Sequence, residues 1–217
     1  MKMERVLTKK NAIHDLLIER LLSAHYAFGE RILVKELAAE TGISRQPIMT
    51  ALSKLNADGF VRIIPQVGCE VINPAKEEIA DFFLMFERME GLLAELAAER
   101  RTDRQLRDLK IIQHQLTLGD GHVITPQEYC EINRDFHQMI HEMAHSPLLD
   151  ERQRNNFNMS DFFINQAVGF ELFMADAMKE HETIIDALEQ RDAARARKVS
   201  EEHIAAIRKA VLSGVAG

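Results

Sequence analysis

The segment His141-Glu142-Met143-Ala144-His145 has the form H-E-x-x-H. In metalloproteases with this pattern, two histidines one helical turn apart bind zinc, and the glutamate between them activates a water molecule. Ser146-Pro147 follows at once, and because proline disfavours helical conformation in the residue before it, the motif would straddle a helix end. No third ligand is marked. A metal-dependent hydrolase is therefore the alternative function, tested by a protease assay with added zinc against a His145→Ala control.

Arg45 and Gln46 offer a different chemistry at the start of a predicted helix. Ser44 has the residue type of an N-cap, and Pro47 is tolerated in a first turn because its missing N–H would be unpaired there. An arginine can donate two parallel hydrogen bonds to guanine, and a glutamine can pair similarly with adenine. The N-terminal end of a helix in a major groove reaches these base edges. The pair predicts base reading, against the simpler interpretation of a solvated polar face.

The elements around this helix determine whether it can enter a groove. Apolar residues recur at i, i+3, i+4 and i+8 from Ile13 to Leu21, and the exit Thr41-Gly42 suits the end of a second helix. In chain order, the predicted elements are helices around residues 13–21, 34–41 and 44–57, then strands over 60–64 and 69–72 joined by the turn 65–68. This is the order of a winged helix-turn-helix.

The charge of the chain is divided unevenly. Among 217 residues, 27 are lysine or arginine and 34 are aspartate or glutamate, a net charge of −7. That acidity argues at first against DNA, because binding a polyanion needs local positive charge. Residues 1–75, however, contain 10 basic and 8 acidic residues, a net of +2, and residues 76–217 contain 17 and 26, a net of −9. The acidity therefore belongs to the second part and leaves DNA binding open for the first.

Composition excludes several other classes of protein. With 46% hydrophobic and 28% charged residues, the chain is globular rather than disordered. Cys69 and Cys130 cannot form a disulfide framework, and no secretory segment is recognised, so we expect a cytoplasmic protein with reduced thiols. The most apolar run, residues 82–86, is far shorter than the roughly 18 residues needed to cross a bilayer, and no membrane partner is expected.

The second part of the chain is predicted to be helical throughout. Its six helices are expected over residues 77–100, 103–118, 126–145, 147–170, 171–190 and 192–213. Helices of this length favour an antiparallel bundle. The sequence therefore predicts a mainly α protein, with a winged helix-turn-helix domain over residues 1–73 and an antiparallel six-helix bundle over residues 74–217.

Both parts resemble known bacterial domains. The first resembles the DNA-binding domain of GntR-family transcription regulators in Gly42-Ile43-Ser44-Arg45-Gln46-Pro47-Ile48, Ala51-Leu52, Leu55, Asp58-Gly59-Phe60-Val61 and Gly68-Cys69-Glu70-Val71. The second resembles the FCD effector domain of the FadR subfamily in residues 90–100, Asn133-Arg134-Asp135-Phe136-His137, residues 180–185 and His203. The resemblance implies a transcription regulator rather than an enzyme, with an effector-binding and dimerisation domain after the winged helix.

The resemblance implies DNA contacts from several residues. They are Lys35, Ser44, Arg45, Gln46 and the wing around Gln66 and Gly68, to which Thr50 on the exposed helix face and Arg62 in the wing are added. One departure concerns Met49, where the family usually has a DNA-binding arginine. Methionine cannot make that polar contact, so we expect an altered or weaker operator contact at this position.

A divalent metal site is also implied by the resemblance. FCD domains often bind a metal through three histidines and an aspartate, or sometimes an asparagine, four residues before the first histidine. By position, the ligands here are Asn133, His137, His181 and His203. Neutral imidazoles suit zinc or nickel, and open positions could take an effector carboxylate. The neutral amide of Asn133 is a weaker ligand than a carboxylate, and the alternative is three buried histidines that hydrogen-bond to one another and to water.

For the effector, we expect a small carboxylate metabolite and name Arg88, Arg134 and His141 as candidate contacts. The family often has an arginine where Phe86 stands, and Arg88 lies two residues away on a different face. A homodimer on a palindromic operator is expected, because recognition helices about 34 Å apart match two half-sites. A third possibility is a protein-interaction module that keeps a winged helix without reading DNA, which Met49 would allow.

Overall fold

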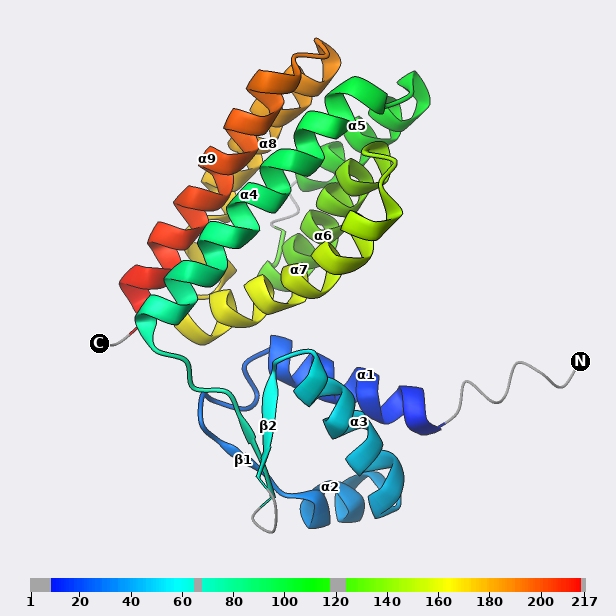
Figure 1. Cartoon of the computed structure of the whole chain (residues 1–217), viewed down its shortest axis with the longest axis vertical. Coiled ribbons are helices and arrows are strands. Elements are labelled where there is room, and N and C mark those ends of the chain that lie inside the picture. Colours follow the sequence, from blue (N-terminus) through cyan, green and yellow to red (C-terminus); the bar gives the residue numbers. More distant parts are fainter. Residues whose placement is uncertain (1–8, 65–67, 118–123, 216–217) are drawn as a thin grey trace, which may run out of the picture. The chain divides into compact units, whose positions relative to one another are not determined.

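The computed structural model describes residues 9–64, 68–117 and 124–215. They form two compact units, and the boundary between them along the chain lies between Ala75 and Lys76 (Figure 1). The predicted domain boundary lies two residues earlier, between residues 73 and 74.

The first unit contains three helices and a small antiparallel sheet. Its elements are α1 (Lys9–Leu22), β1 (Arg31–Ile32), α2 (Val34–Thr41), α3 (Arg45–Ala57), β2 (Val61–Ile64) and β3 (Gly68–Val71). The strand order is β1-β3-β2, with Arg62 of β2 opposite Glu70 of β3. The predicted winged helix-turn-helix is confirmed, with one strand added. Strand β1 escaped prediction because two residues are too few to show an alternating pattern.

Burial of one face holds helix α3 in place. Ile48, Leu52 and Leu55 are fully buried, and α3 packs against α1 and α2. Gly42 ends α2 in the left-handed conformation, with φ of 66°, which glycine adopts without a steric penalty. Ser44 takes the N-cap position as predicted, although its side chain makes no capping hydrogen bond. The opposite face of α3 is consequently presented to solvent.

The second unit is a helical bundle. Its described helices are α4 (Lys76–Arg100), α5 (Asp103–Thr117), α6 (Pro126–Met143), α7 (Pro147–Ala167), α8 (Met174–Glu189) and α9 (Ala193–Gly214). The six predicted helices and the mainly α fold are therefore confirmed. A core of aliphatic and aromatic side chains, including Leu109, Phe136 and Leu188, fills the bundle. None of the described helices combines the length and the apolar character needed to cross a membrane.

Three predicted helix boundaries in this unit differ from the structure by two residues or more. The helix expected over 147–170 ends at Ala167, and the helix expected over 171–190 begins at Met174, because Gly169 has φ of 72° and Phe170–Leu172 form a separate 3-10 turn. The helix expected over 126–145 ends at Met143. Its continuation is prevented at the approach to Pro147, which disfavours helical conformation in the residue before it.

Helices α4 and α9 lie side by side over much of their length (Figure 1). Gly91 of α4 makes this close packing possible, since a Cβ atom added there would lie 2.5 Å from Cγ of Glu201 on α9. No side chain fits into such a gap without displacing Glu201. Helix α4 is therefore held tightly against α9, and it also contacts α6, α7 and α8.

Candidate DNA-reading face and candidate metal centre

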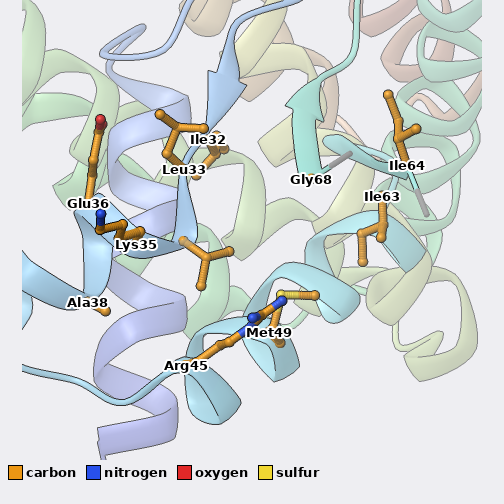
Figure 2. A pocket seen from close by; sticks show the side chains of 11 residues that line it. Ile32, Leu33, Lys35, Glu36, Ala38, Arg45, Met49, Ile63, Ile64 and Gly68 are labelled. Atoms are coloured by element: carbon orange, nitrogen blue, oxygen red, sulfur yellow. The ribbon is translucent and has the colours of Figure 1, made fainter. Parts of the chain in front are cut away.

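A groove in the first unit collects several of the predicted DNA contacts. It has a volume of about 880 Å³ and is lined by Lys35 of α2, Arg45 and Met49 of α3, and Gly68 of β3, among others (Figure 2). Arg45 is exposed and makes no hydrogen bond or ion pair with the residues that the structure describes. Its guanidinium is therefore available to a ligand.

The other predicted DNA contacts lie on or beside the same elements. Ser44, Gln46 and Thr50 are exposed at or near the N-terminal half of α3, and Arg62 is exposed on β2. The Thr50 hydroxyl donates to the Gln46 carbonyl oxygen at 3.0 Å. Gln66 lies outside the described residues.

In the second unit, three helices bring His137, His181 and His203 together. The residues belong to α6, α8 and α9, all three are buried, and one ring nitrogen of each lies within 4.8 Å of the others. Over the described residues, this is the one cluster of histidine, cysteine or acidic side chains arranged closely enough for a metal ion. The structure thus assembles the three histidines that the resemblance implied.

Each of these histidines has an oxygen acceptor beside its Nδ1 atom. The pairs are His137 with Glu90 at 2.8 Å, His181 with Gln113 at 3.2 Å, and His203 with Glu180 at 2.7 Å. The amide nitrogen of Gln113 donates to the Met178 carbonyl oxygen, which leaves its own oxygen facing His181. An oxygen acceptor requires an N–H donor, so Nδ1 of each ring holds the proton and Nε2 keeps its lone pair.

The Nε2 atoms of the cluster indicate whether its residues fit a metal ion. The Nε2 atoms of His181 and His203 are buried and have no hydrogen-bond partner among the described residues. A buried polar atom left without a partner costs about 1–3 kcal/mol, so such atoms need an explanation. Metal-binding histidines commonly donate their second ring N–H to a carboxylate or carbonyl oxygen, which is the arrangement found here. The donor set therefore fits a divalent metal.

The protonation state of His137 and His181 also favours metal binding. Burial lowers the pKa of His137, and burial together with the neighbouring His203 and His137 rings lowers the pKa of His181 well below the ordinary 6.5. Both rings are therefore neutral at pH 7, which is the form that binds a cation.

Asn133, the fourth implied ligand, lies one helical turn before His137 on α6 and is buried. Its side-chain oxygen accepts a hydrogen bond from the Tyr129 hydroxyl at 3.3 Å. An amide oxygen has a second lone pair, and that lone pair is the one a metal would use. The ligand role of Asn133 stays a prediction.

Glu90 joins the histidine cluster to a second histidine. Its carboxylate is 3% exposed, and its Oε1 atom lies 2.7 Å from Nε2 of His141 and accepts from the amide of Gln153 at 2.8 Å. Burial would raise the pKa of Glu90, but the interactions with His141 and His137 outweigh burial and lower it. The carboxylate is therefore ionised, and it fixes two imidazole rings at once.

This geometry bears on the H-E-x-x-H motif. His141 is buried and bound to Glu90, whereas His145 is exposed, has φ of 48° and lies beyond the end of α6. The two histidines do not share one helical face. The metal-dependent hydrolase alternative therefore lacks the paired ligands that it requires.

Two of the three candidate effector residues line one cavity. Arg134 and His141 contribute to a cavity of about 260 Å³ between α6 and α7, and its wall includes Phe157, whose ring packs 4.9 Å from that of His137. Arg88 does not reach this cavity. It is largely exposed on α4 and forms an ion pair with Glu201 of α9.

Arg134 is held by a buried acid. Its guanidinium lies 2.6 Å from the carboxylate of Asp161, which is 2% exposed, and Cys130 also contacts that carboxylate at 3.8 Å. Burial raises the pKa of Asp161 from 3.8 to about 6, even though Arg134 opposes the shift. Desolvation of the carboxylate is therefore the larger effect.

We expect Asp161→Asn to stabilise the protein at pH 7.5. The folded protein binds the Asp161 proton more tightly than the unfolded chain, so this group lowers stability progressively as pH rises from about 4 to about 6. Two pKa units correspond to about 3 kcal/mol. Urea unfolding of both proteins should show the variant more stable at pH 7.5 and the difference much smaller at pH 4.5. A difference that does not change with pH would contradict this role.

Sequence comparisons bear on the whole chain. Residues 9–71 match the gntR family of bacterial regulatory proteins, and residues 81–206 match the FCD domain. The chain belongs to the GntR family. This GntR regulator therefore combines a DNA-binding winged helix with an FCD domain, and it is a transcription regulator.

The relatives of this GntR regulator are named as regulators. It is 23% identical over 200 residues to the HTH-type transcriptional repressor GlaR of Escherichia coli K12, covering 85% of this chain and 87% of GlaR. It is 22% identical over 202 residues to a protein of Paenarthrobacter nicotinovorans named "Probable D-xylose utilization operon transcriptional repressor", covering 92% of this chain and 87% of that protein. The solved structure of E. coli McbR/YncC has a TM-score of 0.70 at 19% identity, covering 92% and 97%, which shows a shared fold.

Sequence reasoning about this GntR regulator missed Glu90, Gln113 and Glu180. A signal existed for Glu90, because it lies on the buried stripe of α4 with Phe83, Phe86 and neighbouring apolar residues. A charged residue on a buried stripe requires a buried partner. Gln113 and Glu180 carry no comparable signal, since polar residues of these types are common on exposed helix faces.

Proposed function

We propose that this regulator binds a palindromic operator as a homodimer and that a small carboxylate metabolite controls its affinity for DNA. The metabolite binds in the FCD domain, beside a divalent metal held by His137, His181 and His203. The observation that carries the proposal is the set of buried Nε2 atoms left without partners in that cluster.

The free cationic residues of the first unit support operator binding. Lys35 and Arg45 are exposed beside one groove and have no partner among the described residues. Ser44, Gln46, Thr50, Arg62, Gln66 and Gly68 complete the proposed contact set. Lysine and arginine attract phosphate, and the arginine and glutamine at the N-terminal end of α3 read bases. Two half-sites related by symmetry then require two copies of the chain.

The histidine cluster supports the metal. Three imidazoles with oxygen acceptors beside their Nδ1 atoms suit zinc or nickel, and Asn133 is the proposed fourth ligand. When bound, such an ion supplies positive charge close to the effector cavity, because Phe157 of the cavity wall packs against the His137 ring. Glu90, Gln113 and Glu180 orient the three rings, because each accepts from an Nδ1–H.

The cavity beside α6 supports a carboxylate effector. Arg134 is held by Asp161 but is still 41% exposed, so its guanidinium has donors left for an anion. His141 lies at the same cavity and is linked through Glu90 to His137. A volume of about 260 Å³ suits a small acid. Control of DNA binding then requires that the acid bind one arrangement of the protein more tightly than the other.

A thermal-shift screen of small carboxylates and sugar acids tests this function. An acid present at 100 times its dissociation constant stabilises the native state by about 2.7 kcal/mol, which raises Tm by about 5–10 °C. We expect such a shift in metal-loaded protein, a smaller one after EDTA treatment, and release of operator DNA by the same acid.

Two matched arginine variants sharpen the screen. Arg134→Gln should lose the shift, and Arg88→Gln, whose parent residue pairs with Glu201 away from the cavity, should keep it. If Arg134→Gln and the parent protein responded equally, the acid would bind elsewhere. If operator affinity were unchanged by every acid that stabilises the protein, the control function would be wrong.

A further inference from the structure

The groove beside α3 is mainly apolar. Besides Lys35, Glu36 and Arg45, its lining consists of Ile32, Leu33, Val34, Ala38, Met49, Ile63, Ile64 and Gly68 (Figure 2). Leu33 is 48% exposed, and Met49, Ile63 and Ile64 are half-buried. Apolar surface that stays in water is stabilised by a partner that covers it. On a DNA-reading face, that partner is an apolar group of the DNA.

The hydroxyl groups of α3 do not make this face more polar. The Thr50 hydroxyl donates to the Gln46 carbonyl oxygen at 3.0 Å, and the Ser53 hydroxyl donates to the Met49 carbonyl oxygen at 2.8 Å. Both donors are therefore used within the helix. Beyond Arg45 and Gln46, the face offers DNA chiefly the thioether of Met49 and the methyl group of Thr50.

In the major groove, the apolar group of DNA is the 5-methyl group of thymine. We propose that Met49 reads a thymine by contact with this methyl group. Methionine is unbranched and polarizable, so it adapts to a methyl surface. The inference rests on the proposed operator binding and adds the base that this position selects.

The position of Met49 on α3 also fixes where the thymine lies. Arg45 and Met49 are four residues apart and share one face of the helix. Four residues advance the helix by about 6 Å, which is about two base-pair steps of 3.4 Å. The thymine therefore lies within about two base pairs of the guanine that Arg45 binds. Lys35, at the side of the same groove, supplies a positive charge that attracts a phosphate nearby.

The test begins with selection of bound sequences from random duplex DNA. Each thymine of the selected operator is then replaced in turn by deoxyuridine, which removes only the 5-methyl group. At one thymine per half-site we expect binding to weaken about fourfold, or about 15-fold when both half-sites are changed, because one buried methyl group contributes about 0.8 kcal/mol. Other thymines should show little change.

Variants of the protein test whether Met49 causes the weaker binding to deoxyuridine. With Met49→Ala, the loss on deoxyuridine substitution should fall below about twofold, whereas Met85→Ala, which removes an exposed methionine of α4, should leave it unchanged. Met49→Arg should change the preferred base at this position from thymine to guanine. Circular dichroism of each variant confirms folding.

The outcomes separate the two hypotheses. Selection that enriches no sequence would overturn the proposed operator binding and the thymine contact with it. An enriched operator without a methyl-sensitive thymine, or with one that is still sensitive in Met49→Ala, would leave operator binding intact and overturn the role of Met49.

Discussion

Arg45→Ala is expected to weaken operator binding by between about 30-fold and about 10⁴-fold. One bidentate arginine–guanine pair contributes about 1–3 kcal/mol of discrimination, and a symmetric dimer makes two such pairs. The guanidinium of Arg45 has no competing partner among the described residues, so nothing else in the protein compensates for its loss. Fluorescence anisotropy with labelled operator at fixed salt concentration measures the change, because DNA affinity depends on salt.

Two variants distinguish base reading from charge. Arg45→Lys keeps the charge but loses the fork of donors, so it should keep non-specific binding and lose preference for the operator. Lys54→Ala removes one charge from the same helix at an exposed position nine residues later, which is the opposite face of α3. It should change affinity little. Equal losses for Arg45→Ala and Lys54→Ala would mean that α3 contributes only charge.

The second large effect is expected from His181→Ala, which should abolish metal binding by the FCD domain. The parent protein should retain about one ion per chain after dialysis, and that ion should raise Tm. The variant should retain none, and added zinc or nickel should no longer change its Tm. Elemental analysis by mass spectrometry gives the metal content per chain, and thermal unfolding with and without EDTA gives the change in Tm.

Controls make the metal result specific. His145→Ala removes an exposed histidine of the H-E-x-x-H segment and should leave the metal content unchanged, whereas a hydrolase-type site would lose its ion. His203→Gln tests the cluster again in case His181→Ala, which removes a ring stacked 4.0 Å from Phe136, does not fold. Glu90→Gln should keep the fold and weaken metal binding about 10- to 100-fold through the misplaced His137 ring. Unaltered metal content in both histidine variants would overturn the site.

The fold could be predicted largely from local signals. Gly42 marks the end of α2 because its backbone preference acts without any partner, and the apolar stripe of α3 is visible in its own sequence. Strand β1 could not be predicted, because its two residues become a strand only by pairing with Glu70 and Cys69 of β3. Pairing of this kind depends on residues far away in the sequence.

The candidate metal site was also only partly predictable from the sequence. His137, His181 and His203 were found through the resemblance to FCD domains, and their acceptors were not. Each acceptor meets its histidine across 47, 68 or 23 residues of sequence, a distance that no helical period spans. Arg88 was chosen for its place in the sequence, and its ion pair with Glu201 depends on the packing of α4 against α9.

Helix α4 packs against α9 as a long, continuous helix that can move as one body. The helix is 25 residues long, about 37 Å, and its first residue directly follows the last residue of the winged-helix unit. Glu90 lies 14 residues further along the same continuous helix, about 21 Å from its start at Lys76. A ligand that turned or shifted α4 at Glu90 would move the start of the helix by a similar amount, and residues 72–75, which form neither helix nor strand, connect that point to β3. The stiffness of residues 76–89 would then set how much of the movement reaches the junction, and glycines in place of exposed residues such as Asp81 and Leu84 would lower that stiffness without replacing Glu90.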